Sequence, residues 1–215
     1  MCFCSLLMTD EYKDLRRTIY KNEEDLVRFR ALLVHTVLVT DIVNKELQGQ
    51  RKIRWNRVFG STARKGALPL DEEIHMLSDE DRQSERRTAL LELTIQASDV
   101  SHTMQHWHIY QQWNSCLFHE MDKAWKDGRA DSDPRDGWYK GEIGFFKFYI
   151  LPLAERVKES SAFGALGAEL YQSAQSNLIE WEMKGEQVVQ ELIEISAAGR
   201  ERDDKIPEVD DHTGW

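Results

Sequence analysis

The 215-residue sequence is poor in cysteine, proline, long apolar runs and net positive charge. Three cysteines, Cys2, Cys4 and Cys116, cannot form a disulfide framework, which favours a reducing, cytoplasmic setting. No apolar run reaches the ~18 residues that a membrane-spanning helix needs. With 28 basic against 38 acidic residues, the net charge of −10 argues against a general nucleic-acid-binding protein. Only 12 Gly and 4 Pro exclude collagen-like and low-complexity chains.

The remaining sequence predicts an all-α fold, because it shows helical periodicity and no β-hairpin signal or internal repeat. Asn22 is a candidate N-cap for a helix over Leu26 to Leu47, whose wide apolar stripe predicts burial on most sides. Residues Thr88 to Trp113 predict one long helix, or two with a bend near Ser98. Further helices are expected over Trp113 to Lys126 and over Trp138 to Val157, with a kink or break at Pro152. Residues Ala168 to Ala197 predict either a pair of amphipathic helices or a single long helix.

The expected domain organisation is a single domain over residues 1–198, followed by a charged tail over 199–215 that we expect to be disordered. Between the first two long helices, Gln48 to Leu70 is basic and contains several glycines. We interpret this segment as a surface connection with at least one helical turn.

One predicted helix face combines unusual side chains. At about 100° per residue, Asp99, His102, His106, Tyr110 and Trp113 fall within about 80° of arc. Carboxylate and imidazole groups can bind metals or transfer protons, and the aromatic rings could form a wall. The bland alternative is that Asp99 caps or bends a helix and that the histidines are incidental. On the pattern alone, that alternative is favoured.

Two weaker patterns stand outside this face. The run from Gly141 to Phe146 places Glu142 between glycines, ahead of several aromatics; by itself it indicates only a helix packing aromatics into a core. The pair Glu72 and His75 matches half of a di-iron carboxylate motif, and the absence of a second copy argues against metal storage or di-iron chemistry.

Read together, ordered segments resemble the class I cyclic nucleotide phosphodiesterase catalytic domain, over roughly Tyr12 to Ile195. The likeness is to divergent members from single-celled eukaryotes. The segment Val39-Thr40-Asp41-Ile42 resembles the family's Ala-Thr-Asp-Met, and Ile95 to His102 resembles Val-His-x-Ala-Asp-Leu-Ser-Asn. Further along, Tyr110-Gln111-Gln112-Trp113 resembles Tyr-Arg-Gln-Trp. Last, Gly141 to Phe145 resembles Ser-Gln-Val-Gly-Phe, and Ile150 to Leu153 resembles the His-Pro-Leu that follows it.

The resemblance implies an all-helical enzyme that hydrolyses cAMP or cGMP to the 5′-monophosphate with two divalent metals, typically zinc and magnesium. By matching position, Asp99 would ligate zinc, and Glu142 would stand where the family has its purine-binding glutamine. Tyr110 would orient that residue, while Phe145 and Leu117 would enclose the base. The remaining positions expected near the nucleotide are Trp113, His102 and Ile42.

The sequence also departs from the family. Its His-Asn-x-x-His and His-Asp-x-x-His motifs are absent, and these supply the general-acid histidine and three of the four zinc ligands. Since a catalytic zinc needs three protein ligands, Asp99 alone is insufficient. We therefore expect no catalytic residue in this chain and no activity from it alone. His102 replaces an asparagine of the family motif and Gln96 replaces a histidine.

Glu142 also changes the chemistry of base recognition. Glutamine offers a donor and an acceptor, whereas an ionised glutamate only accepts. Guanine presents N–H donors and adenine presents an acceptor, so the sequence leans to cGMP. A protonated Glu142, hydrogen-bonded by Tyr110 in an apolar slot, would mimic glutamine and restore dual use.

Two functions of different classes stay open. One is the C-terminal part of a cyclic nucleotide phosphodiesterase, which would belong to a larger signalling protein. The other is a non-catalytic helical module that binds cyclic nucleotide or forms a homodimer. The sequence contains 7 tryptophans, and some of them would face solvent without the metal-binding helices of the family. We therefore expect an exposed apolar patch on the side where that metal-binding half would dock.

Overall fold

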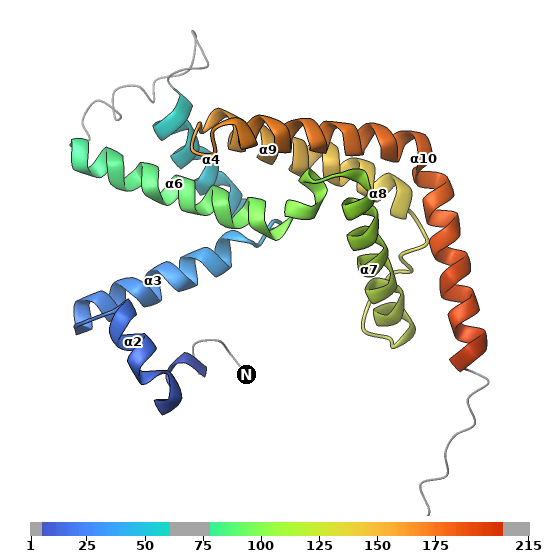
Figure 1. Ribbon diagram of the computed structural model, residues 1–215, viewed down its shortest axis with the longest axis horizontal. Helices are drawn as coiled ribbons and strands as arrows, with labels where there is room; N and C mark the ends of the chain where they lie inside the picture. Colours follow the sequence, from blue (N-terminus) through green and yellow to red (C-terminus); the bar gives the residue numbers. More distant parts are fainter. Residues whose placement is uncertain (1–5, 61–77, 204–215) are drawn as a thin grey trace, which may run out of the picture. The chain divides into compact units, whose positions relative to one another are not determined.

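The computed structural model describes residues 6–60 and 78–203, and within these ranges the chain is helical with no β-strand (Figure 1). The prediction of an all-α fold is therefore confirmed. Four residues singled out by the sequence, Cys2, Cys4, Glu72 and His75, lie outside the described residues. None of the helices within the described ranges combines the length and the hydropathy needed to cross a bilayer.

The chain divides into two compact units at the junction of Asp99 and Val100, and each is described by itself. The N-terminal unit ends with Asp99, and the C-terminal unit begins with Val100. The single domain over residues 1–198 stays a prediction.

The helices of the N-terminal unit are η1 (Asp10–Tyr12), α2 (Lys13–Ile19), α3 (Glu23–Val39), α4 (Lys45–Phe59) and α6 (Asp79–Asp99). Both α3 and α4 pack against α6. The predicted N-cap is confirmed, since the Asn22 side chain accepts a hydrogen bond from the Asp25 backbone N–H at 2.8 Å. At the centre of the unit, buried Glu92 of α6 accepts hydrogen bonds from His35 of α3 and Arg54 of α4.

The helix predicted over Leu26 to Leu47 is wrong in its length and its burial. It ends at Val39 because polar side chains capture the next backbone groups: Asp41 accepts from the N–H groups of Val43 and Asn44, and Asn44 then caps α4. Only Val39 is buried in α3, and Val34 is 55% exposed. In the connection predicted over Gln48 to Leu70, the expected helical turn is part of helix α4, which continues to Phe59, and residues 61–70 lie outside the described residues.

The C-terminal unit comprises η3 (Ser101–Met104), α7 (Trp107–Lys126), α8 (Trp138–Phe145), a π-helical turn η4 (Phe146–Ile150), α9 (Leu151–Glu159) and α10 (Ala165–Asp203). The expected kink near Pro152 takes the form of this π turn, after which Pro152 occupies the first turn of α9, where a missing N–H costs nothing. Large aromatic and apolar side chains fill the core. Those fully buried include Trp181, Tyr110, Phe118, Phe146 and Ile150.

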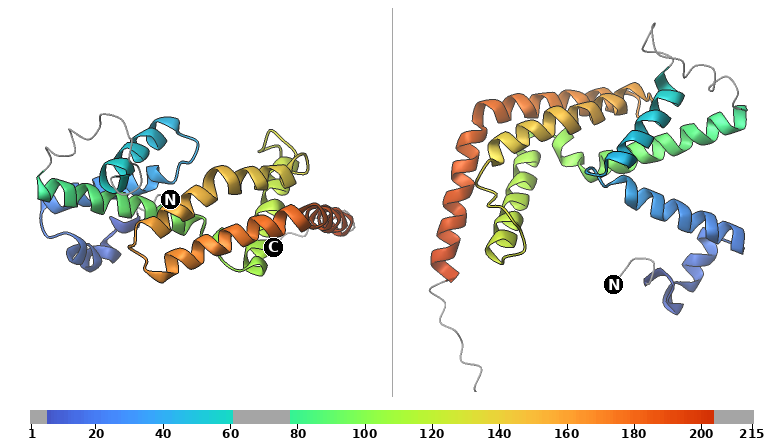
Figure 2. Two further views of the ribbon diagram at one scale, coloured as in Figure 1. Left: turned by 90° about the horizontal axis from the view of Figure 1, so that it is seen from above. Right: turned by 180° about the vertical axis from the view of Figure 1, so that it is seen from behind.

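Helix α10 is one long helix, as one of the two sequence-based alternatives predicts, and it bends partway along its length (Figures 1 and 2). Before the bend it lies against α9, with Gly167 at the contact, where a Cβ atom would approach the Lys158 Cα at 3.1 Å. After the bend it runs beside α7. The helix continues to Asp203, into the predicted tail, and the rest of that tail lies outside the described residues.

The two helices of this second contact, α7 and α10, are joined at buried Asp122 of α7. Its carboxylate accepts hydrogen bonds from Ser196 of α10 and pairs with Lys126 and Arg135. Burial by itself would raise the pKa of Asp122, yet the hydrogen bonds from Lys126 and Ser196 and the charge of Arg135 outweigh it and lower this pKa. The ionised carboxylate therefore holds the C-terminal part of α10 in place.

Candidate functional site

The helix face predicted from Asp99, His102, His106, Tyr110 and Trp113 does not exist as one face. Helix α6 ends at Asp99, His102 lies in η3, His106 is the N-cap residue of α7, and the other two residues lie within α7. The alternative with a break near Ser98 is the correct one.

The break is stabilised by a side chain from far along the sequence. Buried Asn177 of α10 donates through Nδ2 to the backbone carbonyls of Thr103 at 2.9 Å and Gln105 at 2.8 Å. These carbonyls would otherwise need helical N–H partners. The segment between α6 and α7 can therefore leave the helix without burying unpaired backbone groups.

Tyr110 and Glu142, predicted to act together, are in direct contact. The Tyr110 hydroxyl, on α7, donates to Oε2 of Glu142, on α8, with 2.6 Å between the oxygens. Tyr110 is only 1% exposed, and its ring packs edge-on against Phe146 and Trp181. The carboxyl group is thus held by a rigid donor at the edge of the aromatic core.

Burial governs the protonation of both groups. It raises the pKa of Glu142 above its usual value of 4.5, and the hydrogen bonds from Tyr110 and Asn114 offset part of this rise. Burial, and then the charge of Glu142, also raise the pKa of Tyr110 well above its usual value of 10.0. Tyr110 therefore keeps its proton and stays a hydrogen-bond donor.

Two further residues complete this group, and neither was selected from the sequence. Buried Asn114 donates through Nδ2 to the Tyr110 hydroxyl at 3.4 Å, and its Oδ1 accepts from the Trp138 indole N–H at 3.2 Å. A signal was present: Asn114 follows Tyr110 by four residues on α7, and Trp138 precedes Glu142 by four on α8. Residues at this spacing stack on one helix face.

The other predicted nucleotide-binding residues are distributed as follows. Phe145 is half-buried in α8, and its ring stacks with that of Tyr149 at 5.4 Å between centroids. Trp113 and Leu117 lie one turn apart on α7 and are exposed, and the Trp113 ring lies 6.0 Å from the His102 ring. In the N-terminal unit, Ile42 is half-buried in the turn between α3 and α4.

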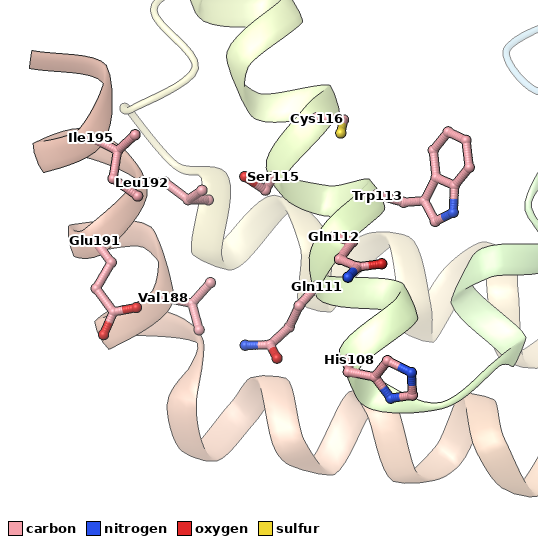
Figure 3. Close-up of a pocket in the computed structure, with 10 residues that line it drawn as sticks. All are labelled: His108, Gln111, Gln112, Trp113, Ser115, Cys116, Val188, Glu191, Leu192 and Ile195. Atoms are coloured by element: carbon pink, nitrogen blue, oxygen red, sulfur yellow. The ribbon is translucent and has the colours of Figure 1, made fainter. Parts of the chain in front are cut away.

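An open pocket of about 810 Å³ lies between α7 and the C-terminal part of α10 (Figure 3). Of the predicted site residues it includes only Trp113, so its position does not coincide with the Tyr110–Glu142 pair. The pocket is lined by His108, Gln111, Gln112, Trp113, Ser115, Cys116, Val188, Glu191, Leu192 and Ile195.

The described residues by themselves do not supply the metal centre that the resemblance implies. Asp99 is exposed at the last position of α6. Within residues 6–60 and 78–203, no group of three or more His, Cys, Asp or Glu side chains is placed to hold a metal ion. A catalytic zinc needs three protein ligands, and the described residues do not bring three together.

Comparisons with known proteins agree with the resemblance. The model of the 3′5′-cyclic nucleotide phosphodiesterase family matches residues 2–163. None of the curated proteins compared with the chain matches it significantly.

Similar solved structures include two crystal structures of the phosphodiesterase domain of a rhodopsin–phosphodiesterase fusion protein from the choanoflagellate Salpingoeca rosetta. The first has 18% identity and a TM-score of 0.58, covering 87% of this chain and 55% of the other. The second has 17% identity and a TM-score of 0.58, with coverages of 89% and 54%. These likenesses concern the fold, and the chain spans about half the length of those domains. On the extent of the family match, the chain belongs to the 3′,5′-cyclic nucleotide phosphodiesterase family.

Proposed function

We propose that this chain is the nucleotide-binding portion of a phosphodiesterase catalytic domain that hydrolyses 3′,5′-cyclic nucleotides to 5′-monophosphates in cyclic nucleotide signalling. The observation that carries the proposal is the hydrogen bond from the buried Tyr110 hydroxyl to Glu142. By resemblance, these residues occupy the family's purine-reading positions, and the contact between them supports that correspondence.

The proposed base contact combines a polar edge with apolar faces. Glu142 would meet the purine edge, Phe145 would stack on one face of the ring, and Leu117 would cover the other. Trp113, His102 and Ile42 would lie around the rest of the nucleotide. An ionised Glu142 accepts hydrogen bonds only, which favours the N–H donors of guanine over the N1 acceptor of adenine. We therefore propose a preference for cGMP.

Turnover requires more than the described residues supply. Family members depend on metals, and in the complete domain Asp99 would be one ligand of a zinc and magnesium pair. Since the chain spans about half the length of the solved domains, we propose that it binds cyclic nucleotide without hydrolysing it. The remaining ligands would come from other parts of a larger signalling protein.

Calorimetric titration of the full chain with cGMP and with cAMP tests the proposal. Truncating Glu142 removes a charged acceptor, so Glu142→Ala should weaken cGMP binding about tenfold or more. The exposed Glu155→Ala on α9 is the matched control and should leave binding unchanged. The proposal would be contradicted if the chain bound neither nucleotide, or if Glu142→Ala bound cGMP as tightly as the wild type.

A second measurement separates the alternatives. Cyclic nucleotide is incubated with the chain and with a longer protein that carries the two missing histidine motifs, each supplied with zinc and magnesium. Hydrolysis by the longer protein alone supports the enzyme. Absence of hydrolysis by both supports the non-catalytic module, and a clear cAMP preference of the longer protein would refute the role given to Glu142.

A further inference from the structure

A chain of hydrogen bonds links four side chains of α7 and α8 and runs in one direction. Trp138 donates to Asn114, Asn114 donates to Tyr110, and Tyr110 donates to Glu142. The donor-to-acceptor distances are 3.2, 3.4 and 2.6 Å in that order. The chemistry of Trp138, the first residue of the chain of hydrogen bonds, sets this direction.

The indole N–H of Trp138 can donate but cannot accept. The side-chain atom of Asn114 that faces it must therefore be Oδ1, which leaves the Nδ2 amide group to face the Tyr110 hydroxyl. A flipped Asn114 would place two donors against each other. Because Asn114 is only 3% exposed, water could not readily repair that mismatch.

The orientation of Asn114 determines what the Tyr110 hydroxyl does. Facing a donor, the phenol oxygen accepts from Asn114, and its own proton points to Oε2 of Glu142. With the amide flipped, Oδ1 of Asn114 would compete with Glu142 for that proton. Trp138 itself is held in place by its edge-on contact with Phe118, with 5.2 Å between the ring centroids.

We propose that Trp138 is a positioning residue that acts through Asn114 and Tyr110, so that Oε2 of Glu142 is always an acceptor and Oε1 is the oxygen that meets the ligand. An ionised carboxyl group then presents an acceptor at Oε1. A protonated one carries its proton on Oε1 and presents a donor there. We call the hydrogen-bond chain from Trp138 through Asn114 and Tyr110 to Glu142 the relay. The use of Oε1 to read a purine rests on the proposed function, whereas the direction of the relay does not.

The relay is tested in the full chain without nucleotide, by carbon-13 NMR titration of the glutamate carboxyl groups. Glu142→Gln identifies the resonance of Glu142. In Trp138→Phe the ring remains but the N–H is lost, so Asn114 is free to flip. The flip would draw the Tyr110 proton away from Glu142 and would also withdraw the direct hydrogen bond of Asn114 to Glu142. Because a carboxylate that loses a donor becomes harder to ionise, the pKa of Glu142 should rise by about one unit.

A double-mutant cycle shows whether the effect passes through Asn114. In an Asn114→Ala background, Trp138→Phe should leave the pKa of Glu142 unchanged. An equal rise in both backgrounds would overturn the relay, as would no rise in the single variant. Trp125→Phe is the matched control, since Trp125 lies on α7 against Arg135 and takes no part in the relay. Thermal unfolding verifies that each variant is folded.

Calorimetry with cGMP then separates the relay from the proposed function. Weaker cGMP binding by Trp138→Phe than by Trp125→Phe supports the use of Oε1 in reading the base. A shifted Glu142 pKa with unchanged cGMP affinity would leave the relay standing and overturn its use in recognition. A shifted pKa in a chain that binds no cyclic nucleotide would uphold the relay and refute the proposed function.

Discussion

The C-terminal unit is built around buried aromatic rings, including Trp181, Tyr110 and Phe118. In the N-terminal unit, none of the aromatic residues in the described ranges is buried, and its centre is the charged Glu92 with His35 and Arg54. Burial of aromatic rings contributes favourable free energy to folding. A buried carboxylate, in contrast, needs its charged partners merely to offset the cost of its desolvation. We therefore expect the two units to differ in what destabilises them.

Among the substitutions considered, Trp181→Ala in the C-terminal unit should cause the largest loss of stability. The side chain is fully buried, contacts the Tyr110 ring, and donates to the Tyr139 carbonyl at 3.0 Å. Loss of this volume should lower the free energy of unfolding by about 3–5 kcal/mol. Chemical denaturation measures it, with the exposed Trp113→Ala as control. A cost below that of Trp113→Ala would show that the stability of this unit does not depend on its buried aromatic rings.

In the N-terminal unit the corresponding test is Glu92→Gln. It removes the charge that pairs with Arg54 and His35 but keeps the shape of the side chain. Because both partners are partly exposed to solvent, we expect a loss of about 2 kcal/mol, below that of a fully buried pair. Urea denaturation measures it. Asp79→Asn, which affects an exposed pair with Arg82, should cost almost nothing, and an equal cost for the two would contradict a charged centre.

The pH dependence of Glu142→Gln connects the aromatic core to the candidate site. The raised pKa of Glu142 means that the folded chain binds its proton more tightly than the unfolded chain does. This contribution to stability is present below the usual pKa and is lost as the pH rises through the raised pKa. Relative to wild type, Glu142→Gln should therefore gain stability as the pH rises, as measured by thermal melts. A gap that is constant with pH would show that the carboxyl group is not buried as described.

The smallest effect is expected on α3, which buries only one of its apolar residues. Val34→Lys, at a position 55% exposed, should change stability by no more than about 0.5 kcal/mol. Val39→Ala, at a position 2% exposed, should cost clearly more. Equilibrium unfolding compares the two. A large loss for Val34→Lys would show that this face of α3 is covered in solution, which is what the predicted docking patch requires.

The sequence predicts local features of this protein better than its long-range ones. The N-cap at Asn22, the all-helical fold and the pairing of Tyr110 with Glu142 follow from short motifs or from family resemblance. The continuous face from Asp99 to Trp113 was wrong because its break depends on Asn177, a residue 74 positions from Thr103. Helical periodicity is a local pattern and does not reveal a partner that lies so far along the sequence.

The candidate site shows the same limit at shorter range. Asn114 and Trp138 each lie four residues from a predicted site residue, yet their meeting depends on how α7 packs against α8. Burial was likewise misjudged for α3, because an apolar stripe indicates which face could be covered and not whether a partner is present. The contact between Tyr110 and Glu142 is observed, but the functional roles of all the site residues stay predictions. These residues are Asp99, Tyr110, Glu142, Phe145, Leu117, Trp113, His102 and Ile42.

The aromatic surroundings of Tyr110 have an optical consequence. Its ring lies 5.5 Å from that of Trp107 and 5.7 Å from that of Trp181. At such separations an excited phenol passes its energy to an indole before it can emit. Tyr110 should thus be dark in the intact chain, with its absorbed light reappearing as short-wavelength emission from the water-shielded Trp181. Because Trp107 lies on α7 together with Tyr110, the phenol stays quenched when α7 loosens from α10. A shift of the Trp181 emission to longer wavelength, as water reaches its ring, would report that loosening without any added dye.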